Sequence, residues 1–135
     1  MLVQKRIKYK NNDESSRFDS LKKSFSLAMK IFELSKKFPK EERYALTDQI
    51  RRSSRSVTAN LSEAYKKRRY PKHFVSKLTD SDAENGETQT WLEYALACDY
   101  VKNSQFDELN KESEEIAKLL SYMILNPEKF GSKNN

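Results

Sequence analysis

The sequence is poor in the residues that turn a chain or crosslink it. Its 135 residues include two glycines, three prolines and one cysteine. So few glycines and prolines cannot supply the many tight turns of a β-sandwich, a β-barrel or a doubly wound sheet. Cys98 can form no disulfide within the chain, which is typical of a reducing cytoplasm. We therefore expect a cytoplasmic, all-α protein with long helices and short connections.

The residues that build catalytic and cofactor sites are scarce as well. His73 is the only histidine, so clustered histidine ligands for a metal cannot form within one chain. Gly86 and Gly131 lie too far apart to form a glycine-rich phosphate loop. Glu63 and Glu87 are open to two interpretations, an acid/base pair or members of a buried polar network. The sequence therefore predicts no enzyme, no cofactor and no metal site.

Long hydrophobic runs are absent too. Tyr94 to Cys98 is among the longest apolar runs, far below the roughly 18 to 20 residues that span a bilayer. The basic first residues lack the apolar stretch of a secretion signal. We expect no membrane partner, a flexible basic arm over residues 1–16, a single domain over 17–130 and a disordered tail over 131–135.

Apolar residues recur at helical spacing through residues 17–130. The pattern predicts four helices, which begin near Asp19, Glu41, Pro71 and Ser104. Tyr70-Pro71 ends the second helix, because proline disfavours helical geometry in the residue before it. Short connections between consecutive helices favour an antiparallel, up-down-up-down four-helix bundle.

The first helix carries two sets of apolar residues. One set comprises Leu21, Phe25, Ala28 and Phe32, and the other Leu27, Ile31, Leu34 and Phe38. At about 100° per residue the two sets lie roughly 120° to 180° apart, so a single small bundle would leave the second set exposed. We therefore predict that the second set is an oligomer interface. Trp91 and Tyr94 lie off the core stripe of the third helix and join this predicted interface, unless Trp91 only widens the core.

Positive charge is concentrated in one part of the chain. The net charge is +6, and residues 40–72 hold ten Lys and Arg against four Asp and Glu. The predicted nucleic-acid contacts are the cations of the second helix and the turn after it: Arg51, Arg52, Arg55, Lys66, Lys67, Arg68, Arg69 and Lys72. Guanidinium groups suit phosphate oxygens, and Tyr65 and Tyr70 are the only nearby rings, so the pattern favours backbone contact over base stacking. A solvated face, or pairing with acids of the third helix or of another subunit, is the alternative.

Two motifs carry a family resemblance over about residues 18–125. Gln49-Ile50-Arg51-Arg52-Ser53-Ser54, with Asn60 and Glu63 further on, resembles the first motif of the bacterial four-helix-bundle family named after 23S rRNA intervening-sequence proteins. Glu87-Thr88 with Trp91 resembles its second. The resemblance implies an antiparallel four-helix bundle that assembles into a homopentameric ring.

The sequence is also similar to the accessory protein of diversity-generating retroelements. That resemblance implies a basic pentamer that binds nucleic acid and a protein partner. Together, charge and resemblance predict a non-catalytic, homo-oligomeric accessory protein that binds RNA or DNA. A structural or protein-partner scaffold with no nucleic-acid role is the alternative.

Overall fold

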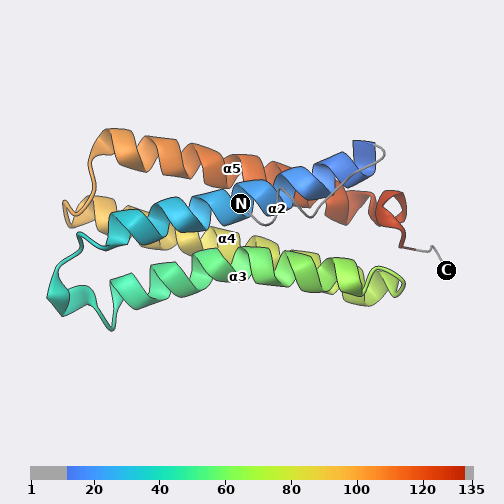
Figure 1. Ribbon diagram of the computed structural model, residues 1–135, viewed down its shortest axis with the longest axis horizontal. Coiled ribbons are helices and arrows are strands. Elements are labelled where there is room, and N and C mark those ends of the chain that lie inside the picture. Colours follow the sequence, from blue (N-terminus) through green and yellow to red (C-terminus); the bar gives the residue numbers. More distant parts are fainter. Residues whose placement is uncertain (1–11, 133–135) are drawn as a thin grey trace.

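The computed structural model describes residues 12–132, which form four long helices. These are α2 (Asn12–Ser35), α3 (Leu46–Lys66), α4 (Pro71–Ala97) and α5 (Asn103–Leu125), with short 3-10 helices η1 (Lys40–Glu42) and η2 (Pro127–Phe130). No strand occurs in this range, so the all-α prediction is confirmed. Figure 1 shows the four helices packed side by side, with the chain reversing direction at each connection between them.

Ion pairs link α2 to α5. Lys23 Nζ on α2 lies 3.0 Å from a carboxylate oxygen of Glu115 on α5, and Lys30 Nζ lies 2.8 Å from Glu112. Residue numbers rise along one helix as they fall along the other, so α2 and α5 are antiparallel. α2 also packs against α3, and α4 completes the bundle by contacting both α3 and α5.

Helix ends follow local signals in most places. Pro71 opens α4, since a proline at the first helical position has no N–H to leave unpaired. α2 instead begins at Asn12, well before the predicted start near Asp19, so residues 12–16 of the expected flexible arm are helical. Residues 1–11 of that arm lie outside the described range.

Residues 131 and 132, which belong to the expected disordered tail, have a defined place in the structure. Ser132 is 4% exposed, and Gly131 adopts a left-handed conformation (φ 86°) that directs the chain back toward the bundle. Residues 133–135 lie outside the described range.

The predicted exposed stripe of the first helix is wrong for most of its members. Leu27, Ile31 and Phe38 are only 2%, 1% and 8% exposed, and they pack in the core of the same chain. Leu34 is half-buried. The accessible part of α2 lies on the side of the helix that faces away from these buried residues, where Met29 is 44% exposed. The residue pattern of the first helix therefore no longer argues for a second copy.

Buried serines explain why one face looks like two stripes in the sequence. Ser20, Ser24 and Ser35 are all buried on α2. At helical spacing Ser24 and Ser35 lie between the two apolar sets, and Ser20 lies on the side of the second set. Their hydroxyls donate to backbone carbonyls of the same helix, and those of Ser24 and Ser35 also accept hydrogen bonds from α3. The buried side of α2 is thus a single wide face with small residues at its centre, and it contacts both α3 and α5.

A layer of buried polar side chains crosses the middle of the core. The Asn85 side-chain amide donates to the Ser113 carbonyl, and the Ser113 hydroxyl donates back to the Asn85 side-chain oxygen, each at 2.9 Å. Gln89 donates to the same hydroxyl, and the hydroxyls of Thr88 and Ser53 lie 2.9 Å apart. Because these buried groups are paired with one another, their desolvation is compensated. We refer to this set as the polar layer.

The connections at one end of the bundle are joined by Tyr100. Its hydroxyl donates to a carboxylate oxygen of Glu42 at 2.9 Å, and its ring packs 5.6 Å from that of Phe38. The hydrogen bond, with burial and the negative charge of Glu42, raises the pKa of Tyr100 to about 12. The phenol is the donor, so the neutral form is the one that the bond stabilises.

We therefore expect Tyr100 to ionise late in an ultraviolet titration. The absorbance difference between wild type and Tyr100→Phe should titrate near pH 12, not near the ordinary value of 10.0. Because the folded-state pKa is raised, this bond stabilises the fold fully below the unfolded pKa and is lost as pH rises through 12. A difference that titrates near pH 10 in protein that is still folded by circular dichroism would contradict the bond.

Candidate nucleic-acid interface

The predicted cations occupy different environments, and Arg52 is held by acids of its own chain. One terminal nitrogen lies 3.1 Å from Glu84 and the other contacts Glu87, both on α4. Both bonds raise the pKa of Arg52, and the hydrogen bond to Glu87 has the largest effect. Glu87 also accepts a hydrogen bond from the indole of Trp91 at 3.1 Å. Arg52 thus follows the alternative interpretation, in which basic residues pair with the acidic third helix.

Arg51 and Arg55 lie together over one aromatic ring. Their guanidinium carbons are 4.8 and 5.3 Å from the ring centroid of Phe32, and Arg51 Nε donates to the Ser35 hydroxyl at 2.7 Å. These side chains border a hollow of about 620 Å³ between α2 and α3, whose other lining residues are Asp48, Arg52, Ser56 and Ala59. We call this site the arginine cleft.

The arginine cleft has the geometry of an anion site. The bond to Ser35 uses Nε of Arg51, so its terminal nitrogens can donate side by side to an acceptor such as a phosphate. The cation–π contact with Phe32 favours this position of both guanidinium groups. The role of Phe32 was not predicted, because its ring meets these arginines only once α2 and α3 have packed.

The second exposed group of cations surrounds the turn between α3 and α4. Lys66, Lys67, Arg69 and Lys72 are all exposed, and within residues 12–132 none of them forms an ion pair. We call these four residues the end cluster. Lys66 follows Arg51 by about 22 Å along α3, so the arginine cleft and the end cluster are separate sites on one helix.

Arg68 lies within this turn but is not part of the exposed group. Its guanidinium stacks over the ring of Tyr65 at 4.2 Å and donates to the Tyr65 carbonyl at 3.2 Å. Its aliphatic part packs against Gly131. Arg68 is therefore half-buried and holds the end of the chain against the bundle.

The carboxylates considered as an acid/base pair have separate partners. Lys77 Nζ lies 2.8 Å from Glu63, and this hydrogen bond lowers the pKa of Glu63, with Lys67 adding to the effect. Glu87 is bound by Arg52 and Trp91. Neither carboxylate belongs to the polar layer. In the described part of the chain no three His, Cys, Asp or Glu side chains gather as a metal site would require.

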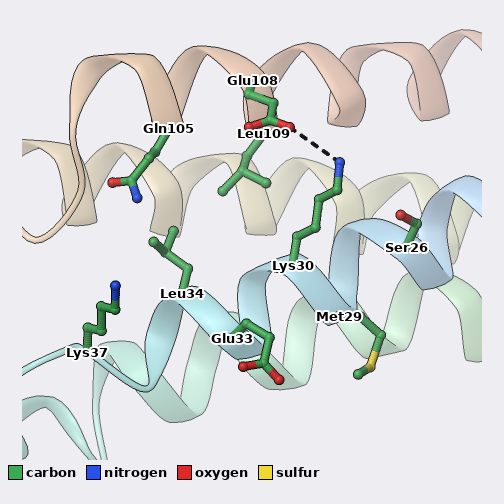
Figure 2. A pocket seen from close by; sticks show the side chains of 9 residues that line it. All are labelled: Ser26, Met29, Lys30, Glu33, Leu34, Lys37, Gln105, Glu108 and Leu109. Atoms are coloured by element: carbon green, nitrogen blue, oxygen red, sulfur yellow. Dashed lines mark hydrogen bonds and ion pairs between the residues drawn. The ribbon is translucent and has the colours of Figure 1, made fainter.

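A groove of about 660 Å³ runs between α2 and α5. Figure 2 shows its lining: Ser26, Met29, Lys30, Glu33, Leu34, Lys37, Gln105, Glu108 and Leu109. Lys30 reaches across it to Glu108 at 3.4 Å and to Glu112 at 2.8 Å, which raises its pKa. Charges of both signs border this groove, and Lys30 is paired with Glu108 and Glu112. The groove therefore lacks the excess of positive charge that the arginine cleft and the end cluster have.

Residues 16–122 match the family of 23S rRNA-intervening sequence proteins. The chain belongs to this family. A solved structure from Bacteroides thetaiotaomicron, described as a protein with unknown function from the S23 ribosomal protein family, is similar in sequence and fold. It is 32% identical, with a TM-score of 0.74 over 82% of this chain and 98% of that one. No curated protein matches the sequence.

The family match includes both exposed groups of cations and the aromatic pair on α4. Trp91 is half-buried and packs against the core, whereas Tyr94 is 56% exposed beside it with the two rings 5.8 Å apart. None of the helices in residues 12–132 has the length and apolar character needed to cross a membrane.

Proposed function

We propose that this member of the 23S rRNA-intervening sequence protein family is a non-catalytic, cytoplasmic, homo-oligomeric protein that binds RNA or DNA through phosphate contacts. The observation that carries the proposal is the end cluster, where four cations are exposed around one turn without ion pairs among residues 12–132. Like charges this close repel one another, and a phosphate backbone relieves that repulsion. The arginine cleft supplies a second phosphate site on the same helix.

Salt dependence tests this proposal directly. If four cations neutralise phosphates, the logarithm of affinity for single-stranded RNA should fall with a slope of about −3 against the logarithm of salt concentration. This corresponds to a loss of about fiftyfold between roughly 50 and 200 mM salt. Fluorescence anisotropy with a labelled RNA of about 20 mixed nucleotides, long enough to span several phosphate sites, measures it.

Arg52→Gln is the matched control for this measurement. Its guanidinium is already bound to Glu84 and Glu87, so its replacement should leave the salt slope unchanged. A slope near zero in the wild type would mean that RNA does not release counterions on binding, and phosphate contact would be abandoned.

The homo-oligomeric part of the proposal rests on the family resemblance, from which we expect five copies. With Leu27, Ile31 and Phe38 in the core, the predicted contact residues that stay accessible are Trp91, Tyr94 and Leu34. An assembly of several copies would present several end clusters to one nucleic acid and raise its avidity.

A protein scaffold is the second candidate function. It is favoured by the exposed ring of Tyr94 beside Trp91, since aromatic residues are enriched at protein interfaces. In this case the partner is a protein, and nucleic acid has no effect on the assembly. The charge reversal described in the Discussion distinguishes the two functions.

A further inference from the structure

Tyr70 holds an exposed aromatic ring in the middle of the end cluster. Its side chain is 63% exposed, in the turn between α3 and α4. Its backbone is fixed on both sides, because its N–H donates to the Lys67 carbonyl and its carbonyl accepts from the Phe74 N–H, both at 2.9 Å. Pro71 further restricts it to an extended conformation. The ring is therefore presented to solvent by a rigid turn.

The only ring contact of Tyr70 in the described residues leaves a face of the phenol open. His73 meets it in a T-shaped arrangement, with ring centroids 6.1 Å apart and planes at 88°. Such a contact covers at most one face of the tyrosine. An open aromatic face at the same turn as Lys66, Lys67, Arg69 and Lys72 combines the two elements of single-strand recognition, a stacking surface and backbone-binding cations.

Two other tyrosines, Tyr65 near this end and the highly exposed Tyr44, do not offer this combination. The ring of Tyr65 lies 3.4 Å from the guanidinium carbon of Arg17 and 4.2 Å from that of Arg68, so cations already stack on it. Tyr44 is 85% exposed, but it follows η1, at the end of the bundle opposite the end cluster (Figure 1). Of these three tyrosines, only Tyr70 has an open aromatic face and lies at the end cluster.

We propose that Tyr70 stacks on an unpaired base of a single-stranded nucleic acid whose phosphates contact the end cluster. This inference rests on the proposed nucleic-acid binding and adds its substrate class. A base inside a duplex is covered by its neighbours on both faces, whereas a base in a loop or single strand can leave the stack. The protein therefore prefers single strands and loops to duplex of the same length.

Tyr70→Ala separates stacking from phosphate contact. We expect the affinity for a labelled single-stranded RNA to fall about tenfold, the size of one lost base stack, while affinity for the matching duplex changes by less than about twofold. Tyr70→Phe keeps the aromatic face and should bind like the wild type. Tyr44→Ala removes an equally accessible tyrosine far from the end cluster and should have no effect.

Fluorescence of Tyr70→Trp gives a direct second measurement. The new indole should be quenched when the single-stranded RNA binds, and the wild type, whose one tryptophan is Trp91, provides the baseline. The same sequence as DNA shows whether the sugar matters.

The two proposals fail in different ways. A wild type that binds neither single strand nor duplex overturns the proposed function and this inference together. If salt-dependent binding is present but Tyr70→Ala leaves it unchanged, or weakens single strand and duplex equally, only the stacking is overturned.

Discussion

Ile31→Ala should lower the free energy of unfolding by about 2 to 5 kcal/mol, the usual cost of removing a large aliphatic side chain from a core. Ile31 is 1% exposed and belongs to the continuous cluster of buried side chains. Alanine would leave a cavity between α2 and its neighbours that rigid helices fill only in part. Urea unfolding followed by circular dichroism measures the loss.

Met29→Ala is the control on the same helix. Met29 is 44% exposed, so its truncation should change the free energy of unfolding by no more than about 0.5 kcal/mol. If Ile31→Ala instead kept the stability of the wild type and reduced the mass seen by light scattering, Ile31 would be a contact between copies after all.

Reversing the end cluster should remove nucleic-acid binding. In the variant in which Lys66, Lys67, Arg69 and Lys72 are all glutamate, we expect affinity for single-stranded RNA to fall by at least about a hundredfold near 100 mM salt. Phosphate contacts are lost and repulsion replaces them. The fold should persist, because these side chains are exposed and make no ion pairs within residues 12–132.

A variant with the same total charge tests whether position matters. Lys22, Lys102, Lys111 and Lys118 are exposed on other parts of the bundle, and replacing them with glutamate changes the net charge equally. That variant should retain most of the binding. Equal loss in both variants would point to a diffuse field with no phosphate site at the turn.

Light scattering on the same two variants distinguishes binding from scaffolding. If the end cluster contacts nucleic acid, its reversal leaves the mass of the assembly unchanged. If instead these cations pair with acids of a neighbouring copy, reversal reduces that mass and nucleic acid has no effect on the wild type.

The sequence predicts the secondary structure well where the signals are local. The break at Tyr70-Pro71 depends on the short-range effect of proline on the preceding residue, and it is confirmed. The burial of α2 could not be predicted from such local signals. Ser24 and Ser35 look like polar interruptions in the sequence, but their hydroxyls bond to their own helix, so they can be buried at its centre.

The sequence predicts which cations belong to the candidate site, but it does not predict which of them form ion pairs. Arg51, Arg52 and Arg55 are close in the sequence, yet Arg52 alone meets Glu84 and Glu87. Which arginine faces those acids depends on how α3 and α4 are rotated and aligned. That alignment is a tertiary property, so the sequence alone could not divide the arginines between an ion pair and the arginine cleft.

The polar layer makes one axial alignment of α4 and α5 different from all others. Leucine and isoleucine pack acceptably after a slide of one turn, about 5.4 Å, but the reciprocal bonds between Asn85 and Ser113 would then break. A slid helix would strand two polar groups in a dry interior. The polar layer thus fixes the axial position of α4 against α5, and with it the position of the turn that carries Tyr70.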